Sequence, residues 1–272
     1  MIAILIINVT IRWNVRRIAI YGKGGIGKST VSSNVAAAMA ESGLKVMHIG
    51  CDPKSDSTTL LLKNTKCPTV LDAMRNNSDP TLGDIVKEGY GGILCIECGG
   101  PKPGSGCAGR GIIAAFEKLE ELDAIGTFHP DVVIYDVLGD VVCGGFAMPI
   151  RNGYARDVFV VTSGEMMSLY AASNICEAVR SFSQDGYARF GGLIQNSRNV
   201  ESEDELIDKA ASEMGTTVVS RIRRDPSVQR CEGRGVTVVE GEPDSEQAAA
   251  YRTLAETLTS CSEDTEGGLR LG

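Results

Sequence analysis

The sequence lacks an excess of basic residues. It holds 27 lysines and arginines against 35 aspartates and glutamates, a formal net charge of −8 over 272 residues. General nucleic-acid binders gain affinity by neutralising phosphates with lysine and arginine, so this balance argues against that class. No stretch approaches the roughly 20 apolar residues that a membrane-spanning helix needs. We therefore predict neither a nucleic-acid partner nor a membrane association.

The first 15 residues lack the marks of a signal peptide. Residues 1–7 are apolar, but no basic segment precedes them and no small-residue cleavage site follows. Two interpretations stay open, an extra edge strand or a start codon placed too early, and the second is favoured because the next strand begins cleanly at Arg17. At the other end, residues 260–272 are rich in glycine, serine and glutamate and are expected to fray.

The cysteines do not form the even set of a disulfide framework. Their number is odd, and the chain is long enough to bury a core without staples. Reduced thiols in a cytoplasmic protein are therefore favoured, and some of them can ligate metal. The nine are Cys51, Cys67, Cys95, Cys98, Cys107, Cys143, Cys176, Cys231 and Cys261.

Half of a zinc motif is present, without the other half. Cys95 and Cys98 have C-x₂-C spacing, but no second C-x₂-C follows. Side chains three apart on a strand point to opposite faces, so zinc is not favoured there. Cys51 and Cys176 are interpreted as small buried apolar residues.

No internal repeat and no linker rich in proline, glycine or serine divides the chain. Strand-like runs that are apolar throughout alternate with helical patterns, which is typical of strands covered on both faces. We predict an α/β fold, a single doubly wound and mostly parallel sheet over residues 16–259, with ligands at the carboxyl ends of the strands. The expected strands are 18–21, 46–49, 93–96, 132–135, 158–162 and 190–194, and the expected helices are 30–42, 111–122, 166–182 and 202–214.

A phosphate-binding loop follows the first expected strand. Residues 22–29 satisfy G-x-x-x-x-G-K-[ST] and lead into a helix, which is the context that this P-loop motif requires. Backbone N–H groups of the loop can surround phosphates, Lys28 supplies positive charge to the β and γ oxygens, and Ser29 can ligate Mg²⁺. The residues predicted to bind the nucleotide are Gly22, Lys23, Gly24, Gly25, Ile26, Gly27, Lys28, Ser29 and Thr30.

Three carboxylates are expected near this loop. Asp136 ends the apolar run 132–135, where a Walker B carboxylate orients Mg²⁺ through its water shell. Asp52 and Asp56 follow another strand and reach the same rim, so one of the three can position the attacking water. A single aspartate at a strand end is more often a cap or turn residue, but several converging on one loop make that less favoured.

Two further cysteines lie in glycine-rich settings. Cys107 precedes a helix that begins at Gly111, where a thiolate is stabilised by the helix N-terminus. Cys143 comes seven residues after Asp136 and precedes two glycines. A [4Fe–4S] cluster needs four thiolates, and these segments offer two per chain, so two subunits complete the set.

The chain resembles the nitrogenase iron-protein family, the dinitrogenase reductases. The similarity runs from about Arg17 to Tyr251 and is far more specific than a P-loop alone. It is carried by residues 20–30, 50–54, 99–101, 106–111, 135–151, 163–167 and 196–199.

The resemblance implies a homodimer with one [4Fe–4S] cluster, held by Cys107 and Cys143 of both subunits, and one MgATP per subunit. Electrons from ferredoxin or flavodoxin would pass through the cluster to the larger dinitrogenase, driven by ATP hydrolysis. Lys23 resembles the lysine of deviant Walker loops that reaches the partner's nucleotide. The resemblance further implies roles in hydrolysis for Lys23, Asp52, Asp56 and Asp136, adenine contact by Asn196, and ADP-ribosylation of Arg110.

The chain departs from the family pattern at a few positions. Cys98 stands where serine is usual, residues 223–226 replace a Pro-Arg-Asp segment, residues 63–89 diverge, and the usual C-terminal tail is mostly missing. Two alternatives stay open: a reductase for a tetrapyrrole-reducing partner and a partitioning or positioning ATPase. The second would call for a basic or amphipathic terminal helix, which the acidic tail does not offer.

Overall fold

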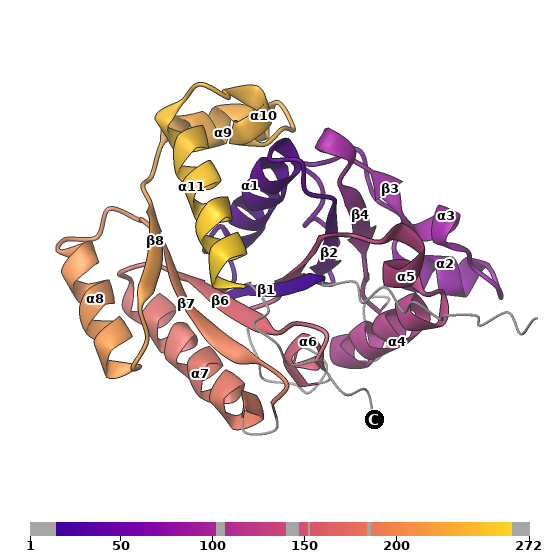
Figure 1. Ribbon diagram of the computed structural model, residues 1–272, viewed down its shortest axis with the longest axis horizontal. Coiled ribbons are helices and arrows are strands. Elements are labelled where there is room, and N and C mark those ends of the chain that lie inside the picture. Colours follow the sequence, from indigo (N-terminus) through magenta and orange to yellow (C-terminus); the bar gives the residue numbers. More distant parts are fainter. Residues whose placement is uncertain (1–14, 102–106, 140–146, 152, 184–185, 263–272) are drawn as a thin grey trace, which may run out of the picture.

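An eight-stranded sheet with helices on both faces forms the centre of the molecule (Figure 1). The computed structural model describes residues 15–101, 107–139, 147–151, 153–183 and 186–262. Its strands run in the order β3-β4-β2-β5-β1-β6-β7-β8, parallel except for β3. They are β1 (Arg16–Gly22), β2 (Val46–Cys51), β3 (Lys87–Glu88), β4 (Leu94–Glu97), β5 (Val132–Val137), β6 (Asp157–Thr162), β7 (Arg189–Asn196) and β8 (Val218–Ile222).

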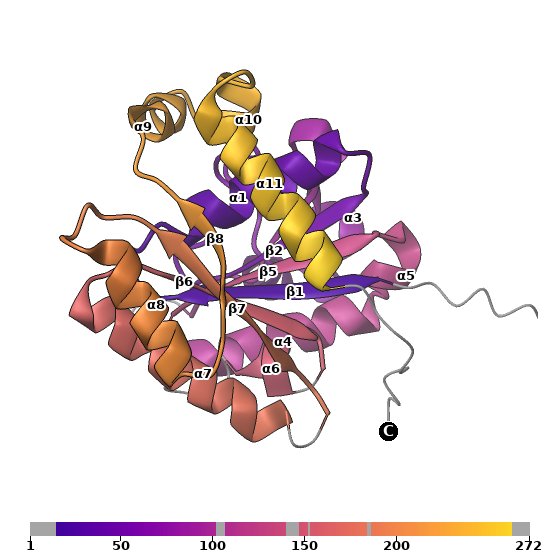
Figure 2. The ribbon, with the colours of Figure 1, turned by 60° about the vertical axis from the view of Figure 1, so that its left-hand side comes forward.

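The helices divide between the two faces of the sheet (Figure 2). One face packs on α1 (Lys28–Glu41), α10 (Val238–Gly241) and α11 (Glu246–Cys261), near α9 (Pro226–Gly233). The other packs on α2 (Val70–Asn76), α4 (Ala108–Glu121), α6 (Met148–Arg151), α7 (Met166–Ser183) and α8 (Glu203–Glu213). The short elements α3 (Leu82–Ile85), η1 (Tyr90–Gly92) and α5 (Ala124–Phe128) complete the set in the described residues.

The central strands are buried along their whole length. Every residue of β2, β5 and β6 is buried, as their uninterrupted apolar sequences predict. All six expected strands and all four expected helices are present, and the predicted fold class is confirmed. The carboxyl ends of β1, β2, β4 and β5 meet at one edge, where the predicted site residues lie.

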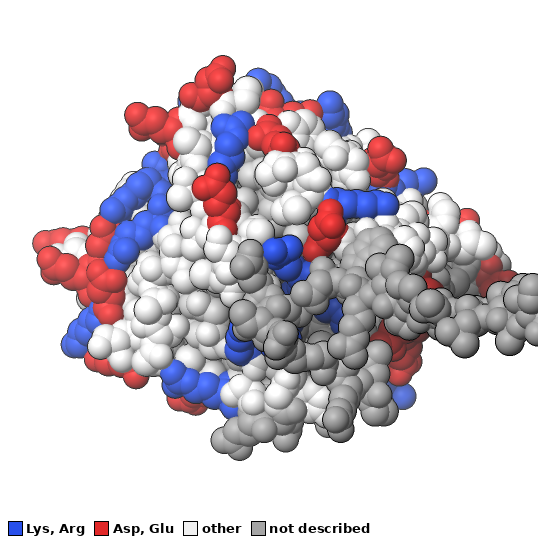
Figure 3. Space-filling model, viewed as in Figure 1, with Lys and Arg blue, Asp and Glu red and all other residues white. Residues whose placement is uncertain are grey.

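The ends of the chain and its surface bear on the remaining predictions. Residues 1–14 and 263–272 lie outside the described part, whereas Ser260 and Cys261 belong to helix α11. None of the described helices has the length and apolarity to cross a bilayer. Basic and acidic side chains are mixed over the face shown in Figure 3. Ion pairs among the described residues include Arg252 with Glu41 at 2.9 Å and Arg230 with Glu242 at 2.8 Å.

Candidate functional site

The phosphate loop joins β1 to α1 and is closed from one side by Asn196. Gly27, the residue before the helix, has φ 92°, a left-handed conformation that favours glycine. A β-carbon at this position would lie 2.5 Å from Asn196 Nδ2. That same nitrogen donates a hydrogen bond to the Ile26 carbonyl at 2.7 Å. The end of β7 therefore holds the loop from a position remote in sequence, and glycine is required for the approach.

Lys28 and Asp136 form a buried ion pair below the loop. The distance from Lys28 Nζ to Asp136 Oδ1 is 3.1 Å, and the two side chains are 7% and 0% exposed. Burial raises the pKa of Asp136, but nearby Lys28 and His48 and the hydroxyls of Ser29 and Ser57 outweigh it, so this pKa lies below its usual value. Asp136 is thus ionised next to the phosphate loop.

The surroundings of Asp136 fit a hydrated magnesium ion. Among the described residues, the Lys28 ammonium lies 3.1 Å from Asp136 Oδ1 and the Ser29 and Ser57 hydroxyls are close to the carboxylate, but neither oxygen accepts a well-aligned hydrogen bond. Buried carboxylate oxygens that lack such bonds call for a ligand or ordered solvent. Ser29 is the neighbouring P-loop hydroxyl that can ligate the ion directly.

The other predicted catalytic residues lie around the same rim. Asp52 follows β2, is buried, and accepts a hydrogen bond from Lys54 N at 2.9 Å. Asp56 is exposed, and Lys23 is half-buried in the loop. The structure therefore brings Lys28, Asp136 and Asp52 to one edge, with Asp56 exposed and Lys23 partly exposed at the same rim.

A pocket of about 440 Å³ adjoins the loop on the side of Asn196. Polar groups dominate its wall, and Gly27 and Thr30 form the border with the phosphate loop. Residues 224–226 and Tyr251 also line the pocket. A cavity of this size beside a phosphate loop is suited to the nucleoside part of a nucleotide.

A buried carboxyl group that the sequence analysis missed, Glu97, lies two strands away from Asp136 in the sheet. Glu97 ends β4 and is 0% exposed, and its Oε1 accepts hydrogen bonds from Thr58 N at 2.7 Å and Thr58 Oγ1 at 2.8 Å. Gly50 of β2 is paired with Glu97 on one side and with Asp136 of β5 on the other. A β-carbon on Gly50 would lie 2.1 Å from Glu97 Oε2, so glycine leaves the space that the Glu97 side chain occupies. Glu97 therefore anchors the segment that carries Asp52 and Asp56. Its place directly after an apolar run is the same signal that identified Asp136.

Glu97 should make stability fall as pH rises. Burial is the main reason that its pKa is raised to about 8 from 4.5, with smaller contributions from Asp136 and Asp56. The folded state keeps the proton between these values while the unfolded state loses it, so the free energy of unfolding decreases from about pH 4.5 to about pH 8 and is then flat. Glu97→Gln should remove this decrease and gain on the order of 4 kcal/mol over the parent at pH 8.

Denaturant titrations of the nucleotide-free protein between pH 5 and pH 8 measure this effect. The exposed Glu88→Gln serves as the matched control and should keep the parent's pH profile. Parallel profiles for the parent and Glu97→Gln would show that Glu97 is ionised in the folded state. His48 adds an opposite trend, because burial lowers its pKa to about 4 and the folded state loses stability as pH falls below about 6.5.

Cys107 lies immediately before helix α4, at its N-cap, and is exposed. The helix N-terminus favours a thiolate, and exposure lets groups from outside the chain reach the sulfur. Arg110, in the first turn of α4, is also exposed. Cys143 lies outside the described residues. Of the two cysteines predicted to hold the cluster, Cys107 is the one in the described part of the chain.

The remaining cysteines of interest are structural. Cys95 and Cys98 are both fully buried, in the hydrophobic clusters on opposite faces of the sheet. Their side chains therefore diverge, as expected, and do not form half of a zinc site. Cys51 and Cys176 are also buried, which agrees with the apolar interpretation.

The fold and the loop define the class: a P-loop protein with the fold of MinD and ParA ATPases. The cell division ATPase MinD of Pyrococcus furiosus superposes with a TM-score of 0.70 at 19% identity, covering 90% of this chain and 98% of that one. A ParA family ATPase from Chlorobium tepidum gives 0.68 at 19% identity, over 89% and 99%. Cobyrinic acid a,c-diamide synthase from Mycobacterium smegmatis, solved with an ATP analog and magnesium, gives 0.67 at 19% identity, over 90% and 94%.

Sequence comparison identifies the family within this class. Residues 16–266 match the model described as 4Fe-4S iron sulfur cluster binding proteins, NifH/frxC family. The nitrogenase iron protein of Methanospirillum hungatei is 54% identical over 247 residues, covering 89% of this chain and 87% of the relative. The chain therefore belongs to the nitrogenase iron-protein family. The predicted enzyme class, a nitrogenase reductase with a [4Fe–4S] cluster and MgATP, is confirmed at the level of this family.

Proposed function

We propose that this protein is the ATP-dependent electron donor of a nitrogenase, a cytoplasmic homodimer that accepts electrons from ferredoxin or flavodoxin and passes them to dinitrogenase. The 54% identity to a nitrogenase iron protein carries the proposal. The geometry supports it, because a phosphate loop with a buried Lys28–Asp136 pair lies on the same chain as an exposed thiol at the start of α4. A tetrapyrrole reductase role is not favoured by these similarities.

The nucleotide would be held by groups that the fold already places. Amides of residues 22–30 surround the phosphates, Lys28 neutralises their charge, and Ser29 and Asp136 hold the hydrated Mg²⁺. The adenosine would occupy the pocket beside Asn196. Asp52 and Asp56, anchored through Thr58 and Glu97, are suited to orient the attacking water. Lys23 would reach the nucleotide of the partner subunit.

The cluster would be shared by two subunits, with Cys107 and Cys143 as ligands from each. When bound, it supplies a one-electron carrier of low potential. The start of α4 contributes its backbone dipole toward Cys107, which favours the thiolate over the thiol. Arg110 would then lie beside the docking surface, where ADP-ribosylation adds bulk and blocks the larger partner.

The segment after Asp136 is in direct backbone contact with the phosphate loop. A β-carbon on Gly139 would lie 1.8 Å from the Gly22 carbonyl oxygen and 2.9 Å from Lys23 Cα. No rotamer change can relieve this contact, because both sides are main chain. The absence of a side chain at Gly139 thus lets the segment after Asp136 contact the first residues of the phosphate loop.

Gly139→Ala should separate these two segments. We expect a loss of stability of about 2 kcal/mol from overpacking and a drop of more than tenfold in ATP hydrolysis, since the loop is displaced from Asp136. Steady-state hydrolysis and thermal unfolding measure the two effects. Gly233→Ala is the matched control because an added β-carbon there meets no atom within 4 Å. Equal activities for the two variants would contradict the close contact.

The proposed function is tested by electron delivery. The anaerobically purified dimer is mixed with MgATP, a chemical reductant and either dinitrogenase or a tetrapyrrole reductase catalytic component. Substrate reduction by dinitrogenase alone supports the proposal. Activity only with the tetrapyrrole enzyme would assign the alternative, and a protein that binds no iron after reconstitution would overturn both.

A further inference from the structure

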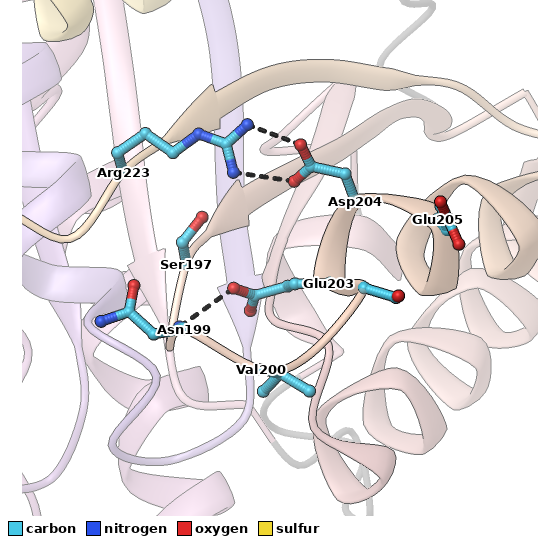
Figure 4. A pocket seen from close by; sticks show the side chains of 8 residues that line it. Ser197, Asn199, Val200, Glu203, Asp204, Glu205 and Arg223 are labelled. Carbon is cyan, nitrogen blue, oxygen red and sulfur yellow. Dashed lines mark hydrogen bonds and ion pairs between the residues drawn. The ribbon is translucent and has the colours of Figure 1, made fainter.

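A carboxylate outside the phosphate loop joins two loops of the candidate site. Glu203 begins helix α8 and is only 6% exposed. It accepts hydrogen bonds from Gly164 N at 2.9 Å, from Arg198 N at 3.0 Å to each oxygen, and from Asn199 N at 3.1 Å. Figure 4 shows the bond to Asn199, at the edge of a pocket of about 360 Å³. One carboxylate therefore satisfies three amides from two separate segments.

The first segment belongs to the nucleoside pocket. It continues from Asn196, whose amide holds the Ile26 carbonyl, and both Asn196 and Asn199 line the pocket beside the phosphate loop. Arg198 donates a hydrogen bond to the Gly25 carbonyl of the same loop. Glu203 thus lies directly behind the residues that would face the base.

The second segment leads into an exposed apolar surface. Gly164 follows β6, and helix α7 begins two residues later with Met166, Met167 and Tyr170, which are 77%, 59% and 62% exposed. Side chains of this size are normally buried, so this surface, residues 166–170, is available to another molecule. Its backbone is tied to the nucleoside side through the Gly164–Glu203 bond.

The junction between the segments is closely packed. A β-carbon on Gly164 would lie 2.8 Å from Glu203 Cγ and 3.3 Å from Val200 Cβ. The connecting loop holds Asn199 at φ 59° and Ser202 at φ 51°, left-handed conformations that persist only where the surroundings enforce them. The hydrogen bonds to the Glu203 carboxylate are among the contacts that hold this loop.

The neighbouring carboxylates behave differently. Asp204 pairs with Arg223 on the surface at 2.5 and 2.8 Å, as Figure 4 shows, and also accepts from Gln195 at 2.6 Å. Glu205 is exposed in the same turn of α8. Glu203 alone of these three is buried with backbone amides as its partners, so its removal would leave amides without acceptors in both loops.

We propose that Glu203 is a positioning residue that joins the nucleoside-binding segment 196–199 to the start of α7, so that nucleoside binding orders the 166–170 surface. The inference rests on the proposed function, in which the pocket beside Asn196 takes the adenosine. The phosphate loop also contacts this segment, through Asn196 and Arg198, so phosphates alone should engage the connection less than a full nucleotide does.

The test compares a full nucleotide with a ligand that has only phosphates. Binding of MgATP and of magnesium tripolyphosphate to the intact dimer is measured by calorimetry for the parent, Glu203→Gln and Gly164→Ala, with Glu205→Gln as the matched control. Both site variants should bind MgATP about tenfold more weakly and tripolyphosphate within twofold of the parent. Hydrogen exchange of residues 164–170 should slow on MgATP binding in the parent and the control but not in the two site variants.

The outcomes separate the inference from the function beneath it. A parent protein that does not bind MgATP would overturn the proposed function, and the role of Glu203 with it. Parent MgATP binding that is unchanged in both site variants would overturn only the role of Glu203. Equal losses for MgATP and tripolyphosphate would also overturn it, because that pattern is what general destabilisation gives.

Discussion

Lys28→Gln is expected to lower the rate of ATP hydrolysis by roughly 10²–10³-fold, the cost of removing a preorganised charge from transferring phosphate. It should also destabilise the nucleotide-free protein by about 3 kcal/mol, because the fully buried Asp136 loses the ammonium group that lies 3.1 Å from it. Steady-state hydrolysis and denaturant unfolding at neutral pH measure these two losses.

The pH dependence of this variant identifies the cause. In the parent, the lowered pKa of Asp136 stabilises the folded state above about pH 4, and this contribution is lost as pH falls through the folded pKa. Without Lys28, the effect of burial dominates and the pKa of Asp136 rises above its usual value. The free energy of unfolding of the variant should therefore decrease as pH increases. Adding Asp136→Asn should restore stability at neutral pH without restoring hydrolysis. If the double variant is as unstable as Lys28→Gln alone, loss of the ion pair is not the cause of the destabilisation.

Cys107→Ser is expected to remove the iron completely while MgATP affinity stays within about threefold of the parent. Serine oxygen is a poor ligand for iron–sulfur clusters, and Cys107, at the start of α4, does not line the pocket beside the phosphate loop. Iron content and visible absorption of the anaerobically reconstituted dimer measure the first effect, and calorimetry measures the second.

The control for this variant is Cys261→Ser, at the end of α11, where the thiol is also exposed. It should keep its iron, about four atoms per dimer for a [4Fe–4S] cluster. A normal cluster in Cys107→Ser would show that this thiol is not a ligand. Loss of iron in both variants would point to general oxidation instead of ligand removal.

Local sequence patterns sufficed for most of the sheet and for the phosphate loop. Strands such as β5 and β6 are covered on both faces, so their uninterrupted apolar runs identify them without knowledge of their neighbours. Strand β8 gave no such run, because it is half-buried at the sheet edge and mixes Ser220 and Arg221 with apolar residues. The short helices α9 and α10 likewise lack a sustained periodic pattern.

The site could be predicted only where chemistry and local pattern coincide. Asp136 was found because a carboxylate at a strand end beside a P-loop has a known use. Glu97 carries the same strand-end signal, but its burial depends on Thr58, 39 residues away in the sequence. Glu203 has no local signal, since an acidic residue in the first turn of a helix is common. Its partner Gly164 also lies 39 residues away in the sequence.

The contact between Gly139 and Gly22 also couples displacements of the phosphate loop to the segment that follows Asp136. Side chains can absorb small displacements by changing rotamer, but Gly139 and Gly22 meet through their main chains. Gly22 also lies close to the main chain of β6, because a β-carbon on Gly22 would be 2.4 Å from the Val161 carbonyl oxygen. Three adjacent strands, β5, β1 and β6, are thus in firm contact at their carboxyl ends. A shift of the phosphate loop would therefore be passed directly to Gly139 and to the backbone that follows Asp136.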